Sequence, residues 1–172
     1  MTALLGFGPP IPAGSSPDLA LEWAGLCFRT AAAGEDVASN VVRGLRTLLS
    51  ALPRGDLGKA SGSLLGEVDA AVCAAIPVLL QKLPRGVSDF SSCMGMASAA
   101  WILRALRDPP KGELTGAWSA YFAERLDYVA LLADELDAAV RRQRINDGGD
   151  LVQRTLQLQR AEAATADGAA SH

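Results

Sequence analysis

Residues 111–145 read KGELTGAWSAYFAERLDYVALLADELDAAVRRQRI, and their spacing decides the fold of this chain. The apolar residues recur at steps of four, four, seven, three, four and four, which keeps them on one face of an α-helix. They are Leu114, Trp118, Phe122, Val129, Leu132, Leu136 and Val140. The stripe predicts a long helix that packs in a bundle. Arg125 interrupts it and disfavours a strict coiled coil.

The residues that follow predict a break and a last helix. Asn146, Asp147, Gly148 and Gly149 are turn-forming residues in a row, so we expect the long helix to end there. A final helix is predicted from residue 150 to about 164. Residues 166–172 are expected to form a frayed tail.

Four more helices are predicted upstream, and serine caps mark two of their starts. Ser16 precedes Pro17, which suits the first helical position, and Ser88 precedes a helical run. The expected ranges are 17–34, 35–52, 61–83 and 88–107. We expect Leu19, Trp23, Leu26 and Cys27 to form the buried stripe of the first, and Val37, Val41, Leu45, Leu48 and Leu49 that of the second. Pro77 is expected to kink or split the third helix.

Small residues recur every fourth position on the third and fourth predicted helices. They are Gly62, Gly66, Ala70 and Ala74, and then Gly95 and Ala99. Such columns let helix backbones approach closely, so these two helices are expected to form the core pair. The alternative interpretation is a groove or a subunit contact.

The composition agrees with a helical, globular protein. Of 172 residues, 49% are hydrophobic and 20% charged, which excludes intrinsic disorder, and Ala and Leu fill about a third of the positions. We therefore predict a single-domain, all-α bundle of five or six helices over residues 18–165, behind an extended Pro/Gly-rich arm at 1–17. The longest uncharged apolar run, residues 70–80, is shorter than a membrane span, so no membrane span is predicted.

Few residues could support catalysis or bind a cofactor. The single histidine is His172, the last residue, which argues against general-base and Ser-His-Asp chemistry. Cys27, Cys73 and Cys93 lie far apart among small or apolar residues and are expected to be buried, reduced thiols of a cytoplasmic protein. Asp134, Glu135 and Asp137 are interpreted as a solvated helix face. We expect no enzyme activity, no metal and no cofactor.

The charges are divided unevenly along the last third of the chain. Residues 112–137 contain six acids and one base, whereas residues 138–160 contain five arginines and two acids. The arginines are Arg141, Arg142, Arg144, Arg154 and Arg160. The helix dipole alone explains such an order. The functional hypothesis is that these arginines bind a partner, or the acidic stretch of another copy.

Three function classes remain open from the sequence. The leading hypothesis is a non-catalytic, self-associating structural or assembly subunit whose arm and last two helices make the contacts. The second is a coat-like subunit that packages nucleic acid through the arginines; rod-shaped viral coat subunits are similar in length and helicity but share no motif. The third is an apolar-ligand binder, or an enzyme without histidine chemistry, with a pocket near Trp101, Met94 and Met96.

Overall fold

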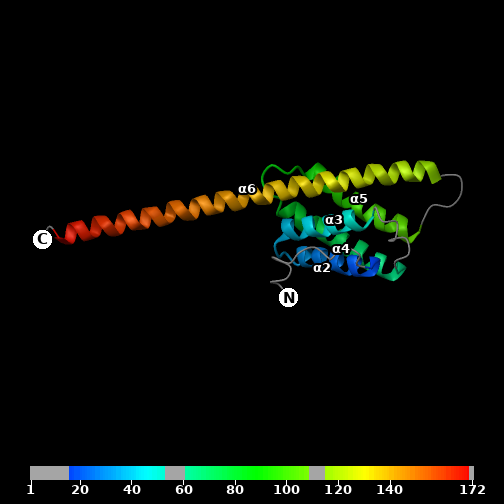
Figure 1. Cartoon of the computed structure of the whole chain (residues 1–172), viewed down its shortest axis with the longest axis horizontal. Helices are drawn as coiled ribbons and strands as arrows, with labels where there is room; N and C mark the ends of the chain where they lie inside the picture. The colour runs from blue at the N-terminus through cyan, green and yellow to red at the C-terminus, as the bar shows by residue number, and fades with distance from the viewer. Residues whose placement is uncertain (1–15, 53–60, 109–114, 171–172) are drawn as a thin grey trace. The chain divides into compact units, whose positions relative to one another are not determined.

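The computed structural model describes residues 16–52, 61–108 and 115–170. In these residues it contains five α-helices and no strand (Figure 1). The predicted all-α class is therefore confirmed. The proline-rich arm lies almost entirely outside the described residues, so its extended conformation stays a prediction.

The chain divides into two units, Met1–Ala139 and Val140–His172. The described helices of the first unit are α2 (Pro17–Ala32), α3 (Val37–Ala51), α4 (Gly62–Gln81) and α5 (Asp89–Arg107), together with the first part of α6 (Thr115–Ala170). The second unit contains the rest of α6. The predicted domain boundaries at residues 17 and 166 stay predictions.

Both predicted serine caps are present. The Ser16 side chain accepts a hydrogen bond from the backbone N–H of Leu19 at 3.2 Å, and Pro17 is the first residue of α2. The Ser88 side chain accepts one from the backbone N–H of Ser91 at 3.1 Å at the start of α5. Each cap satisfies a backbone donor that the helix itself leaves unpaired.

The predicted buried stripe holds for α3, whereas in α2 it holds only for Cys27. Val37, Val41, Leu45 and Leu48 of α3 are buried, and Leu49 is partly buried. In α2, by contrast, Leu19 is 47% exposed, and Trp23 and Leu26 are only partly buried. The buried face of α2 consists of Ala20, Leu21, Ala24, Gly25, Cys27, Phe28 and Ala31. This face is offset from the predicted one and combines two large residues, Leu21 and Phe28, with small residues that let α2 lie close to both α3 and α4.

The small-residue column of α4 forms little of the contact with α5: a Cβ built on Gly62 or Gly66 would reach only the side chain of Arg107, at 3.7 and 3.3 Å. The two helices do pack together, as predicted, but Gly62, Ala70 and Ala74 are exposed. The buried residues of α4 are Leu65, Val68, Asp69, Ala71, Val72, Ala75 and Leu79. Pro77 lies on the exposed side of an unbroken helix and does not split it.

Close backbone approaches occur instead at Gly44 and Gly95. A Cβ atom built on Gly44 would lie 2.7 Å from the ring of Phe28. A Cβ built on Gly95 of α5 would lie 2.4 Å from the Cβ of Leu132 in α6. Both distances are shorter than real Cβ contacts, so a larger residue at either helix crossing would force neighbouring atoms to shift.

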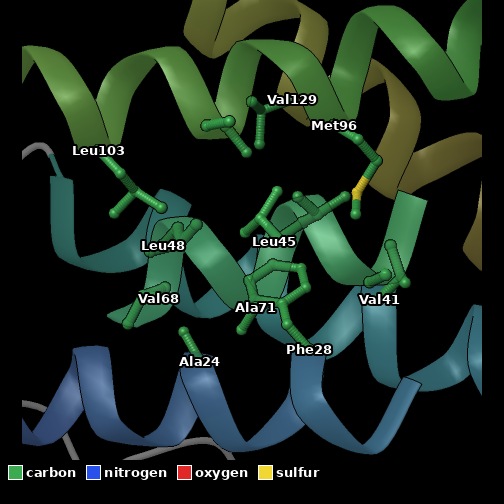
Figure 2. Packing of buried hydrophobic residues seen from close by; sticks show 14 of the residues in the cluster. Ala24, Phe28, Val41, Leu45, Leu48, Val68, Ala71, Met96, Leu103 and Val129 are labelled. Carbon is green, nitrogen blue, oxygen red and sulfur yellow. The ribbon is translucent and has the colours of Figure 1, made fainter. Parts of the chain in front are cut away.

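One continuous core joins the five helices within the first unit. Figure 2 shows representative side chains from each: Ala24 and Phe28 of α2, Val41, Leu45 and Leu48 of α3, Val68 and Ala71 of α4, Met96 and Leu103 of α5, and Val129 of α6. A core assembled from every helix makes the first unit a stable support for its surface residues.

The break predicted at residues 146–149 is wrong. α6 continues through Asn146, Asp147, Gly148 and Gly149 and reaches Ala170, so most of the expected frayed tail is helical as well. Glycine lowers helix stability by about 1 kcal/mol relative to alanine but creates no steric obstacle to a helix. These residues therefore lower the stability of α6 locally without ending it.

By length and composition alone, α4 could cross a membrane, since its mean hydropathy is 1.8 over an 18-residue window. It is the one such helix among the described residues. A third of that window is buried inside the protein, where α4 packs against α2 and α5.

Candidate functional site: a buried carboxylate and an exposed helix

A polar cluster joins α4 to α5. Asp69 is only 8% exposed, and its carboxylate accepts a hydrogen bond from the Nε of Arg104 at 2.9 Å. The thiol of Cys73, one turn further along α4, lies 3.7 Å from the other carboxylate oxygen and 3.4 Å from Arg104 Nη2. Asp69, Cys73 and Arg104 thus each contact the other two.

The cluster suppresses the reactivity of Cys73. Burial raises the pKa of Cys73, and the nearby Asp69 charge raises it further. The hydrogen bond with Asp69 also raises the pKa of Arg104 above its usual range. A protonated thiol is a poor nucleophile. The arrangement therefore fits a link between two helices better than a catalytic centre.

Sequence reasoning missed this cluster. Asp69 and Arg104 are separated by 35 positions, and no local pattern pairs them. The available signal was an aspartate in a helix rich in apolar residues, since a buried charge requires a partner.

A shallow depression of about 310 Å³ lies beside the cluster. It is lined by Trp101, Arg104, Ala105 and Asp108. The predicted ligand pocket included Trp101 but also Met94 and Met96. Met96 is fully buried in the core and Met94 is partly buried, so the structure does not bring the three together around one pocket.

The prediction of three buried thiols is only partly correct. Cys27 is buried, Cys73 is half-buried and Cys93 is exposed, and all three are free. Cys93 is at the outer face of α5, where its small apolar neighbours gave a false indication of burial.

We expect the three thiols to react with iodoacetamide at pH 8 in the order of their exposure. Cys93 should react first, Cys73 more slowly, and Cys27 only after denaturation, because burial raises the pKa of Cys27 from 9.0 to about 11. Because the folded state prefers the protonated Cys27 thiol, the free energy of unfolding keeps its full value below pH 9 and falls as the pH rises towards 11. Mass spectrometry of timed samples would measure the order. Equal rates at Cys27 and Cys93 in the folded protein would contradict it.

Two acidic residues of α6, Asp134 and Asp137, bind the side chain of Arg46 in α3. Arg46 Nη2 lies 3.1 Å from Asp137 Oδ2 and 3.6 Å from Asp134 Oδ1. Among the described residues, no three His, Cys, Asp or Glu side chains are grouped so that they could hold a metal ion.

The five arginines predicted to bind a partner are all exposed on the second unit. At 100° per residue they lie around the helix rather than on one face. Arg142 and Arg160 share a direction but are 18 residues apart, which is about 27 Å along the axis. One chain therefore does not gather them into a single basic patch, and their role as partner-binding residues stays a prediction.

The same segment exposes large apolar side chains. Ile145 is 73% exposed, Val152 60% and Leu156 46%, and at 100° per residue they point within about 40° of one another. With Gly149, Gln159 and Ala163 they form a line at steps of four, three, four, three and four, which we call the C-terminal stripe. Leu158, 66% exposed, points to another side of the helix. The break predicted at residues 146–149 separated Ile145 from Val152 and Leu156, so the sequence analysis did not join them into one stripe.

No protein-family model, no curated protein and no solved structure matches this chain.

Proposed function

We propose that this protein is a non-catalytic, self-associating subunit of the cytoplasm and that the second unit, Val140–His172, makes the contact between copies. The observation that carries this proposal is that the part of α6 beyond Val140 buries none of its described side chains in its own chain. Every side chain whose exposure is described between Arg141 and Ala166 is exposed.

Such a helix needs a partner to be stable. Isolated helices are marginal in water, and most helical stability in proteins comes from packing an apolar face. This segment also contains two adjacent glycines, each costing about 1 kcal/mol relative to alanine. Burying Ile145, Val152 and Leu156 against a partner would contribute about 1.5 to 3 kcal/mol each and offset that cost.

Self-association fits the composition of this surface better than nucleic-acid packaging. The apolar stripe offers nothing to a phosphate backbone, and the arginines point in several directions. An interface between two proteins, in contrast, combines an apolar centre with a charged rim.

Sedimentation velocity on the full chain and on residues 1–139, over a range of concentrations, tests the proposal. We expect the full chain to form oligomers and the shortened chain to sediment as a monomer, because the first unit keeps its own core. Helicity of the full chain, followed by circular dichroism, should fall on dilution as its α6 helices separate. A full chain that remains monomeric, with helicity independent of concentration, would refute the proposal. Nucleic acid that co-purifies and is lost at high salt would favour the packaging alternative.

A further inference from the structure

Beyond self-association, and resting on that proposed function, we infer that two copies pair their C-terminal stripes antiparallel, with a two-fold axis beside Arg154. The spacing of the stripe reads the same in both directions, and position 154 is its midpoint. The pairing therefore places Val152 opposite Leu156 of the second copy, Gly149 opposite Gln159, and Ile145 opposite Ala163.

The side chains favour this direction over a parallel one. In the antiparallel pair each small residue meets a larger one, so Gly149 makes room for Gln159 of the second copy and Ala163 for Ile145. A parallel pair would place Gly149 on Gly149, leaving a gap, and Gln159 on Gln159, burying two amides together. Mixed sizes across the contact fill the space evenly along the whole stripe.

The charges beside the stripe are complementary in the same register. Arg144 and Glu162 are 18 residues apart, so they point to the same side of the helix. An antiparallel pair places Arg144 of one copy within about 3 Å, along the axis, of Glu162 of the other. This contact occurs twice by symmetry. Arg154 points directly away from the stripe and takes no part.

Thiols placed at the two ends of the stripe distinguish the directions. In a Cys93→Ser background, Ile145→Cys and Ala163→Cys chains are prepared separately, mixed and oxidised mildly. The antiparallel pair brings positions 145 and 163 of different copies within disulfide distance and holds two 145 positions about 27 Å apart. We expect the mixed 145–163 disulfide to dominate, as identified by mass spectrometry of the linked peptides.

Charge exchange provides an independent measurement. Arg144→Glu should raise the dissociation constant about tenfold, and adding Glu162→Arg should restore it to within about threefold. The matched control is Arg154→Glu with Glu162→Arg. It has the same net charge as the exchanged pair but leaves Arg144 opposite a second arginine, so its dissociation constant should stay raised.

The outcomes separate this inference from the proposed function. Oligomers that form 145–145 disulfides, or neither disulfide, would overturn the antiparallel register and leave self-association intact. A full chain that sediments as a monomer would overturn both.

Discussion

Replacing Gly95 by alanine is expected to lower the free energy of unfolding by about 2 kcal/mol, because α5 and α6 touch at this residue. The added Cβ would lie 2.4 Å from both Cβ and Cδ2 of Leu132, which is fully buried. A contact with a Cβ atom cannot be relieved by rotating a side chain, so the helices themselves must separate. The helix propensity of alanine offsets about 1 kcal/mol of that strain. Thermal or urea denaturation would measure the difference.

Gly66→Ala is the matched control, since Gly66 is also inside a helix of the first unit. Its nearest neighbour would be the guanidinium of Arg107 at 3.3 Å, the mobile end of a long side chain. We expect this variant to be unchanged or stabilised by up to about 1 kcal/mol. Equal stabilities of the Gly95→Ala and Gly66→Ala variants would show that the close approach of α5 to Leu132 is absent.

Leu156→Glu is expected to weaken self-association by at least 100-fold. Each pair of copies would lose two buried leucines, worth about 1.5 to 3 kcal/mol apiece, and would have two charges placed at the centre of the contact. The loss should appear in sedimentation as a shift from oligomer to monomer at micromolar concentration. The first unit should retain its thermal stability, because Leu156 contributes nothing to its core.

Leu158→Glu tests whether position on the helix matters. Leu158 is as apolar as Leu156 and even more exposed, but it points 200° away around the helix. The substitution makes the same change of charge and helix propensity, so we expect the dissociation constant to remain within about threefold. If both variants dissociate equally, the contact does not follow the C-terminal stripe.

Local features of this fold were predictable, and the reasons are physical. Ser16 and Ser88 act through hydrogen bonds that span three residues, so their sequence neighbourhood contains the whole interaction. α3 likewise buries large apolar residues at helical spacing. Where the determining interaction is short-range, the sequence pattern was sufficient.

The failures arose where a distant contact or a competing energy decided the result. α2 buries Leu21 and Phe28 together with its alanines because α3 and α4 meet it on that face, a fact that its own sequence does not contain. The ion pair between Asp69 and Arg104 depends on how α4 meets α5. Gly148 and Gly149 do lower helix stability, but α6 continues through them. Predicting that the helix ends there also separated the residues of the C-terminal stripe.

The carboxylate of Asp69 also affects how α4 behaves before the bundle forms. α4 has the length and mean hydropathy of a membrane-spanning helix, but an aspartate near the middle of such a helix opposes transfer into a bilayer by about 2.5 to 3.5 kcal/mol. Arg104 neutralises that charge only once α5 has docked. Asp69, with Glu67 on the same helix, thus disfavours entry of the unpacked helix into a bilayer, and Asp69 then links α4 to α5 in the folded protein.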